Sequence, residues 1–204
     1  LRWVLQAEQR GTGHAVAQAM PGIADDHTVL VLYGDVPLVR GESLRQLVSR
    51  SGPKSLSLLS AILPDPVGYG RVIRDGGGRV VRIVEHKDAN HKELAIAEVN
   101  TGLLAAPAVR LRAWLAALKP DNAQSEYYLT DCIGAAVRDG CAVEAVIADT
   151  AAEVLGVNDK LQLAEVEAAH RKERAAGLMR SGVTIVDPLR VDIRGDVSCG
   201  RDVV

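Results

Sequence analysis

The stretch "TVLVLYGDVPLV", residues 28–39, combines an apolar run with a Gly-Asp pair directly behind it. Residues 28–33 are apolar on both faces, which is typical of a buried central strand in a parallel sheet. In doubly wound sheets, ligands bind beyond the carboxyl ends of the strands, so Gly34 and Asp35 lie where a site is expected. The stretch therefore predicts a buried strand that ends at a ligand.

The Gly34-Asp35 pair has two interpretations. A carboxylate behind a strand can hold a hard cation, and Mg²⁺ takes one or two protein carboxylates while phosphates and water complete its coordination. Gly34 suits that role, because a residue without a side chain lets a ligand come close to the backbone. The pair also fits a simple turn before Pro37, and the two residues alone leave both interpretations open.

Outward from this stretch, short aliphatic strands alternate with amphipathic helices. This order predicts an α/β fold with a mixed and mostly parallel sheet and helices on both faces. The predicted strands comprise residues 2–6, 28–33, 54–63, 97–106 and 142–148, and the predicted helices begin near residues 12, 42, 107 and 125. Residues 68–87 predict a hairpin, because Gly76-Gly77-Gly78 supplies the positive φ of a tight reversal between two β-branched arms.

The pattern changes beyond Asn158. Residues 159–180 are rich in Ala, Glu, Lys and Arg and predict a linker helix. In residues 181–204, Val191, Val197 and Val203 recur every six residues, which indicates the start of a hexapeptide β-helix. An alternating edge strand fits the same residues, and periodicity alone does not separate the two. The predicted organisation is thus a domain over residues 1–158, the helix, and this last segment.

Composition narrows the function classes. The 204 residues are 48% hydrophobic and 25% charged, which is ordinary for a globular chain able to bury a core. A net charge of −2 argues against a nucleic-acid partner, which would require an excess of Lys and Arg. With no long apolar run and no signal peptide we expect no membrane contact. The odd, irregularly spaced Cys132, Cys141 and Cys199 predict reduced thiols in a cytoplasmic protein.

Further polar residues interrupt the predicted elements. Gly-rich backbone at the helix start Gly11-Thr12 exposes N–H groups to an anion or a carbonyl-bearing ring, with Thr12 as a possible N-cap. Gln6 carries a donor and an acceptor that match one edge of uracil. Each feature also has an ordinary structural interpretation, as a helix cap or as a solvated amide.

Three other stretches interrupt strands with polar side chains, and each also has a simple explanation. Glu85 fits a surface acid, Asn100 a turn residue, and Asn158 the N-cap of the long helix. The five histidines lack zinc-ligand spacing, and no Ser or Cys has a recognisable base nearby, so nucleophilic catalysis has no support. Trp114 and Tyr127-Tyr128 are expected in the core or at its rim.

The order of seven motifs resembles one bacterial family. The motifs are "LQAEQRGTGHAV", "VLYGDVPL", "DPVGYGRV", "IVEHKDA", "VNTGLL", "SEYYLTD" and "EVLGVND". They are similar to the bifunctional N-acetylglucosamine-1-phosphate uridyltransferase and glucosamine-1-phosphate N-acetyltransferase family (GlmU). The resemblance implies a Rossmann-like pyrophosphorylase domain that uses Mg²⁺ to transfer UMP from UTP to N-acetylglucosamine 1-phosphate. The products would be pyrophosphate and UDP-N-acetylglucosamine, a precursor for peptidoglycan and lipopolysaccharide.

Roles follow from the matching motifs. The resemblance implies that Gln6, Gly11 and Thr12 recognise uracil and that Tyr33, Gly34 and Asp35 meet ribose and metal. It implies that Asp35 and Asn158 bind Mg²⁺, and that Gly70, Glu85 and Asn100 contact the amino sugar. No protein nucleophile is implied, since the sugar phosphate itself can attack UTP.

The resemblance also has a gap. The family's Gly-rich nucleotide loop, with its Arg and Lys, precedes the motif that begins at Leu5, and these 204 residues hold no such segment. We therefore expect little or no uridyltransferase activity from these residues alone. The family's acetyltransferase β-helix and its trimer contacts are likewise implied to lie elsewhere, so these residues are expected to be monomeric.

Two other functions remain open. One is a different sugar-1-phosphate nucleotidyltransferase, which a comparison of UTP, dTTP, GTP and CTP would reveal. The other is a non-catalytic module that binds sugar nucleotides without a metal.

Overall fold

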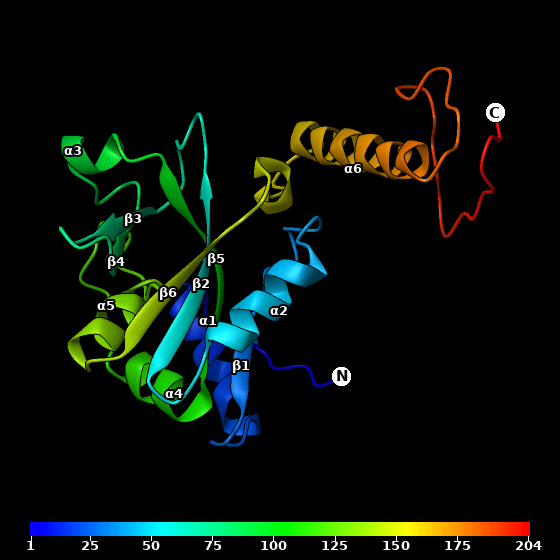
Figure 1. The fold of residues 1–204 in the computed structure, drawn as a ribbon. Coiled ribbons are helices and arrows are strands. Elements are labelled where there is room, and N and C mark those ends of the chain that lie inside the picture. The colour runs from blue at the N-terminus through cyan, green and yellow to red at the C-terminus, as the bar shows by residue number, and fades with distance from the viewer. The chain divides into compact units, whose positions relative to one another are not determined.

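The computed structural model describes all 204 residues, which form two compact units. The first unit comprises residues 1–34 and 39–154, and the second comprises residues 35–38 and 155–204. Figure 1 shows the first unit as a twisted sheet with helices packed on it. None of the helices has the length and apolar character needed to cross a bilayer.

The sheet of the first unit has six strands in the order β4-β3-β5-β2-β6, and β1 also pairs with β5. The strands are β1 (Thr28–Val31), β2 (Ser55–Ile62), β3 (Arg71–Arg74), β4 (Val80–Val84), β5 (Glu98–Pro107) and β6 (Ala142–Ile147). β3 and β4 form the predicted hairpin, in which Gly78 has a φ of +80°. The α/β class and the mixed sheet are confirmed.

The expectation of a mostly parallel sheet is wrong. The only parallel pair is β2 with β6, and the other four strand pairs are antiparallel. The reason is the position of β5, which lies between β1 and β2 and runs against both. β1 and β2 thus share a direction without being hydrogen-bonded to each other.

Two strand predictions also need correction. β1 is not a buried central strand, because Thr28 is exposed and Val29 and Leu30 are only half-buried. Residues 2–6 form no strand, and Trp3 and Leu5 are 90% and 82% exposed. An apolar run becomes a stable strand only when a neighbouring strand satisfies its backbone groups, and no such neighbour pairs with residues 2–6.

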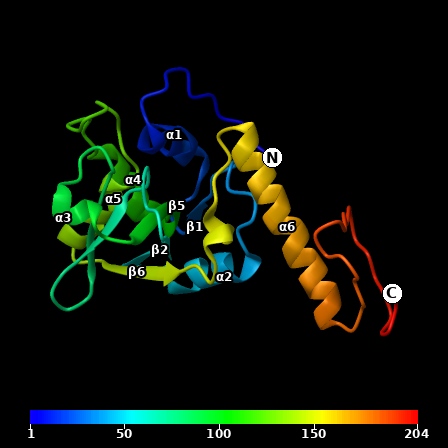
Figure 2. The same cartoon turned by 90° about the horizontal axis from the view of Figure 1, so that it is seen from above.

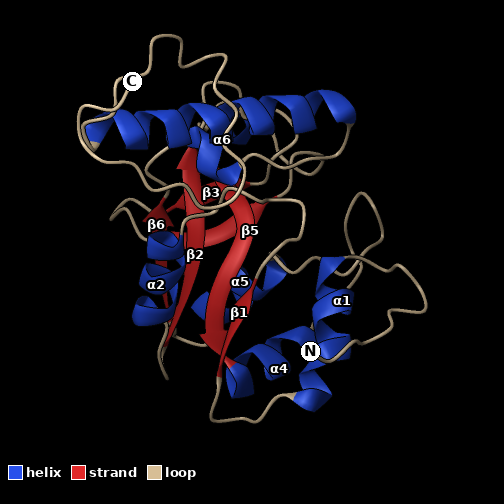
Figure 3. Ribbon diagram, turned by 90° about the vertical axis from the view of Figure 1, so that its right-hand side faces the viewer, coloured by secondary structure: helices blue, strands red, loops and turns tan.

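Helices cover both faces of the sheet, as expected (Figure 3). Apolar side chains of α1, α4 and α5 belong to one core cluster, and those of α2 belong to a second. The bounds are α1 (Thr12–Ala19), α2 (Gly41–Arg50), α3 (His91–Leu94), α4 (Ala108–Ala116) and α5 (Asp131–Arg138), with 3-10 turns η1 (Met20–Gly22) and η2 (Ala151–Val154). The sequence patterns did not predict α3, whose Asn90 and Glu93 form a capping box.

The second unit contains one long helix, α6 (Lys160–Arg180), which Figure 2 shows in orange. Residues 181–204 form no assigned strand, so the predicted β-helix start is not shown. Two backbone hydrogen bonds do join the ends of this segment. Asp202 N donates to Gly182 O, and Thr184 N donates to Val203 O, both at 2.8 Å.

Candidate functional site

Three of the predicted site residues meet where β3, β4 and β5 lie side by side. Gly70 precedes β3, Glu85 follows β4, and Asn100 lies in β5. The N–H of Asn100 donates to the carbonyl of Gly70 at 2.8 Å. A Cβ atom placed on Gly70 would be 3.2 Å from Oε2 of Glu85 and 3.0 Å from Cγ2 of Ile83. The sheet thus brings together these three residues, called the Gly70 group below, and a side chain at Gly70 would push against Glu85.

Glu85 is half-buried and its ionisation is disfavoured. Burial raises the pKa of the Glu85 carboxyl, and the charges of Asp131 and Asp88 raise it further. The hydroxyl of Thr130 donates to Oε1 of Glu85 at 2.8 Å and partly offsets this by lowering the pKa. The net effect is a pKa above the ordinary glutamate value, so Glu85 keeps a proton more readily than an exposed acid.

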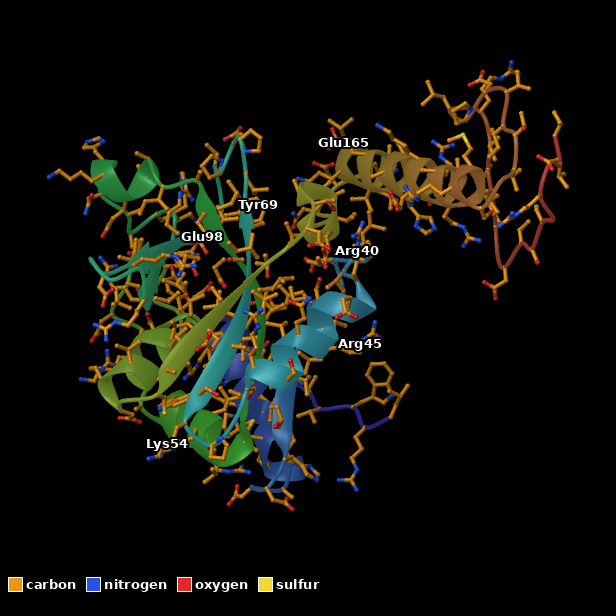
Figure 4. All side chains as sticks on the ribbon, in the orientation of Figure 1. Arg40, Arg45, Lys54, Tyr69, Glu98 and Glu165 are labelled. Atoms are coloured by element: carbon orange, nitrogen blue, oxygen red, sulfur yellow. The ribbon has the colours of Figure 1, made fainter.

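Asn100 is the third residue of the group, and its side-chain amide has no hydrogen-bond partner. This side chain is half-buried. A donor and an acceptor therefore remain available beside Glu85, a combination that suits the hydroxyl and amide groups of a sugar. Figure 4 labels Tyr69 and Glu98 near the end of the sheet where β5 begins, which is the end that carries this group.

Gln6 and Gly11 are also brought together, at the start of α1. Nε2 of Gln6 donates to the carbonyl of Gly11 at 3.2 Å and lies 2.9 Å from Nδ1 of His14. The carbonyl of Gly11 also accepts the N–H of Ala15 at 3.1 Å. Gln6 is therefore not a freely solvated amide. Its NH₂ group already has two protein partners, which leaves its oxygen available.

The start of α1 is hydrogen-bonded to the loop that contains Tyr127. Gly13 N donates to Tyr127 O, and Tyr127 N donates to Arg10 O, both at 2.8 Å. A Cβ atom on Gly11 would lie only 2.8 Å from Tyr127 O, and Gly11 has a φ of +102°, so this position requires glycine. One of the N–H groups that we expected to be free for an anion is thus used by the protein.

The expected role of Thr12 as N-cap is wrong. The N-cap of α1 is Gly11, and no side chain caps the helix. The hydroxyl oxygen of Thr12 instead accepts the N–H of Leu129 at 3.1 Å. Its geometry explains the difference, because Thr12 is already the first helical residue and its side chain points to the loop that packs on the helix.

Tyr33 and Gly34 follow β1 and differ in their surroundings. A Cβ atom on Gly102, which has a φ of +85°, would overlap the ring of Tyr33, so this glycine makes room for the tyrosine. Gly34 is exposed, and a Cβ atom there would meet nothing within 4 Å. The space above Gly34 is open, as ligand access requires, although the fold itself does not demand glycine at this position.

The two predicted metal ligands lie in the second unit, where Asp35 is bonded to the residue that precedes Asn158. Val157 N donates to Asp35 O at 2.8 Å, so Asn158 is one residue away from the partner of Asp35. Both residues are exposed. No cluster of three or more His, Cys, Asp or Glu residues is placed to hold a metal ion. Asp35 and Asn158, called the metal pair below, suit a cation that takes its other ligands from phosphate and water.

The structure excludes one of the two interpretations of Asn158. The N-cap of α6 is Asp159, whose Oδ1 accepts the N–H of Gln162 at 2.8 Å. The backbone N–H of Asn158 donates to Oε1 of Gln162 at 2.7 Å. The interpretation of Asn158 as the helix cap is therefore wrong, and its side-chain amide is not used by α6.

Sequence reasoning missed two residues beside the Gly70 group. One is Thr130, which bonds to Glu85, and the other is Arg71, which is only 1% exposed. A guanidinium nitrogen of Arg71 donates to the carbonyl of Tyr69, and another lies 3.5 Å from Nδ1 of His86. An alternating β pattern would have placed a cation outward, so no signal in the sequence indicated a buried arginine.

The aromatic and cysteine predictions agree with the structure. Trp114 is buried, and its Nε1 donates to Oδ2 of Asp139 at 2.7 Å. Tyr128 is buried as well. Cys132, Cys141 and Cys199 are free thiols. Burial raises the pKa of Cys132 to about 12, so this thiol stays protonated and behaves as a small apolar group.

Comparison with known proteins gives consistent relatives. The sequence profile of a family described as "Nucleotidyl transferase" matches residues 1–152. "Bifunctional protein GlmU" of Aromatoleum aromaticum (strain DSM 19018 / LMG 30748 / EbN1) is 56% identical over 203 residues, covering 100% of this chain and 45% of that protein. "Bifunctional protein GlmU" of Alkalilimnicola ehrlichii (strain ATCC BAA-1101 / DSM 17681 / MLHE-1) is 57% identical over 202 residues, covering 99% of this chain and 43% of that protein. The chain thus spans a little under half the length of these relatives.

A solved structure, that of UDP-glucose pyrophosphorylase complexed with UDP-glucose, matches with a TM-score of 0.56 at 16% sequence identity. The match covers 71% of this chain and 57% of that one. At this identity the likeness shows the fold alone. It agrees with the mixed sheet and its two helical layers.

Proposed function

The chain belongs to the nucleotidyl transferase family, and from that premise we propose that the protein forms UDP-N-acetylglucosamine and pyrophosphate from UTP and N-acetylglucosamine 1-phosphate. The relatives that are 56% and 57% identical support the assignment, since both carry the name "Bifunctional protein GlmU". A nucleotide and a sugar phosphate are the substrate classes that the family and the pyrophosphorylase fold favour.

The observation that carries the proposal is the backbone bond between Val157 and Asp35. It joins the two segments that carry Asp35 and Asn158, which are more than a hundred residues apart in the sequence. Neither side chain has a protein partner in the structure, and both are exposed, so their oxygens are free to bind a cation. A carboxylate and an amide oxygen fit Mg²⁺, the metal we assign, although other divalent ions accept the same donors.

The reaction requires no protein nucleophile. A phosphate oxygen of the sugar phosphate attacks the α-phosphorus of UTP in line, a new P–O bond forms, and the bond from the α-phosphorus to pyrophosphate breaks. A bound Mg²⁺ would offset the negative charge that develops on the phosphates. The protein contributes by holding the two substrates in alignment, which by itself lowers the barrier substantially.

Each group of residues then has a positioning role. Gln6, Gly11 and Thr12 are assigned to the uracil ring, and Tyr33 and Gly34 to the ribose side. The Gly70 group is assigned to N-acetylglucosamine, with Glu85 and Asn100 bonding sugar hydroxyls. The protonation state of Glu85 matters here, because a carboxyl group can donate as well as accept while a carboxylate only accepts.

The arrangement along the chain belongs to the same proposal. Residues 1–158 would form the pyrophosphorylase domain, 159–180 the linker helix, and 181–204 the entry into a left-handed β-helix. The bonds that join Gly182–Thr184 to Asp202–Val203 show only that this segment returns to its own start, which a coil of such a helix would also do. Acetyl transfer from acetyl-CoA, trimer formation and a cytoplasmic location remain proposals for the whole protein.

A nucleotide profile tests the proposal. The natural full-length protein should release pyrophosphate from UTP with N-acetylglucosamine 1-phosphate and Mg²⁺, and much less from dTTP, GTP or CTP. A preference for another nucleotide would indicate a different sugar-1-phosphate nucleotidyltransferase. Metal-independent binding of UDP-N-acetylglucosamine without turnover would indicate a non-catalytic module. For the 204 residues alone, weak or absent release remains the expectation.

A further inference from the structure

The side chain of His14, on α1, lies between two glutamines. Nε2 of Gln6 is 2.9 Å from Nδ1 of His14, and Nε2 of Gln18 is 3.2 Å from Nε2 of His14. The ring of Tyr127 lies beside the imidazole, with ring centroids 6.3 Å apart. His14 was not among the residues that the sequence motifs assigned to a substrate.

The orientation of the Gln6 amide follows from its second contact. Nε2 of Gln6 lies 3.2 Å from the carbonyl of Gly11, and a carbonyl can only accept a hydrogen bond. The atom facing Gly11 must therefore be the NH₂ group. Because the same NH₂ group faces Nδ1 of His14, Nδ1 must be the acceptor and the proton of a neutral His14 resides on Nε2.

The contact with Gln18 does not compete for this role. Nε2 of Gln18 also lies 3.2 Å from the carbonyl of His14, which fixes it as an NH₂ group too. A neutral imidazole has one acceptor nitrogen, so His14 cannot accept from both glutamines. The shorter distance, that to Gln6, indicates that Nδ1 is the acceptor. Gln18 then bonds only to the helix backbone, and its 3.2 Å contact with Nε2 of His14 is not a hydrogen bond, because both nitrogens carry protons.

The Gln6 amide can therefore offer only its oxygen at the proposed uracil position. Both N–H bonds of Gln6 are used within the protein, and only its Oε1 is free to meet a base. Uracil offers an N–H at position 3, which Oε1 can accept. Cytosine has a bare acceptor nitrogen there, so two acceptors would face each other without a proton. A fixed Gln6 is therefore selective, whereas a rotating Gln6 could serve either base.

We propose that His14 is a positioning residue that sets the base selectivity of this site through Gln6. The inference rests on the proposed function, because it takes Gln6 as the group that reads the base. Without His14, the Gln6 amide keeps a single anchor, the Gly11 carbonyl, which already accepts the N–H of Ala15. That weaker restraint lets the amide turn over and present its NH₂ group to cytosine.

The test compares pyrophosphate release from UTP and from CTP in the full-length protein. In His14→Leu, which removes the acceptor, the ratio of kcat/KM for UTP to that for CTP should fall about threefold to tenfold, the factor that one neutral hydrogen bond supplies. His14→Gln should show the same fall, because its longer side chain carries the amide beyond the position of Nδ1. His14→Asn places Oδ1 near that position and should keep the ratio.

Gln18→Leu is the matched control, since it removes the other neighbour of the imidazole and should leave the ratio unchanged. A merely structural role for His14 would lower the rates with both nucleotides together and leave their ratio intact. That result, or an equal fall in His14→Asn and His14→Leu, would overturn the proposal for His14. Failure of the unsubstituted protein to use UTP would instead overturn the proposed function on which it rests.

Discussion

The Gly70 group and the metal pair are both proposed to offer oxygen atoms to a ligand, yet the two regions are built differently. In the Gly70 group, strand pairing fixes the backbone, and a side chain at Gly70 would crowd Glu85 and Ile83. In the metal pair, Asp35 and Asn158 are exposed, and one backbone bond from Val157 holds their segments together. In the proposed function, the Gly70 group gives the sugar site its shape, and the metal pair holds the charge of the cation. Substitutions should therefore affect stability and function together in the first, and function alone in the second.

Asp35→Ala gives the largest expected effect and tests the second half of this comparison. Removal of the carboxylate should lower uridyltransferase kcat/KM about 10²- to 10³-fold, because the Mg²⁺ whose charge would offset the phosphates loses a ligand. The free energy of unfolding should change by less than about 0.5 kcal/mol, since an exposed side chain is removed. Asp26→Ala, at another exposed acid, should change neither quantity. A clear loss of stability in Asp35→Ala would show that the carboxylate supports the fold.

Gly70→Ala tests the other half. The added methyl group would press on Glu85 and Ile83, and a displacement of this kind in a substrate site can reduce kcat/KM about a hundredfold. Overpacking should also lower the free energy of unfolding by about 1–3 kcal/mol. Gly76→Ala is the matched control, because a Cβ atom there meets nothing within 4 Å. Activity in Gly70→Ala equal to that of the control would remove the Gly70 group from the substrate site.

Glu85→Gln separates shape from charge within the Gly70 group. The folded protein raises the pKa of Glu85, so the folded state binds this proton more tightly than the unfolded chain does. This tighter proton binding stabilises the folded protein at a pH below the ordinary glutamate pKa. The stabilisation is lost as the pH rises through the raised pKa of Glu85. Urea unfolding across this pH range should show the unsubstituted protein losing stability relative to Glu85→Gln as the pH rises, since the carboxyls with lowered pKa values act equally in both proteins. Parallel curves would exclude Glu85 as the cause.

A smaller effect distinguishes Asn158 from its neighbour. Asp159→Ala removes the side-chain cap of α6 and should lower helix stability by about 1 kcal/mol, which hydrogen exchange in the first turn can measure. Asn158→Ala should leave that exchange unchanged and weaken metal binding. Faster exchange in Asn158→Ala would return this residue to the structural role that the sequence allowed.

Local patterns predicted most of the fold. The hairpin of β3 and β4 followed from three glycines between β-branched arms, and α1, α2, α4 and β2 followed from the spacing of apolar residues. The direction of β5 did not follow from local patterns, because strand pairing depends on contacts between distant segments. The apolar run of residues 28–33 looks the same in a parallel and in an antiparallel sheet. Residues 2–6 show the same limit, since their strand pattern has no partner.

The site shows a similar division. Motif order assigned residues to groups, and the structure brings together Gly70 with Glu85 and Asn100, and Gln6 with Gly11. The contributions of His14, Thr130 and Arg71 arise from side chains that meet only after folding, and no local pattern marks them. The predicted N-cap was wrong by one residue at both helices. Gly11, which precedes Thr12, caps α1, and Asp159, which follows Asn158, caps α6. In each pair the two residues have about the same cap propensity, so the sequence could not separate them.

The central claim is that Asp35 and Asn158 bind one divalent cation together during uridyl transfer. The most direct test is a double-mutant cycle on the Mg²⁺ dependence of pyrophosphate release in the full-length protein, with Asp35→Asn, Asn158→Ala and both. Each single variant should raise the half-saturating Mg²⁺ concentration at least about tenfold, and the double variant should be hardly worse than Asp35→Asn alone. A shared metal site would be contradicted if the effects of the two single substitutions on the half-saturating Mg²⁺ concentration multiply in the double variant. It would also be contradicted if either single variant leaves the Mg²⁺ dependence unchanged.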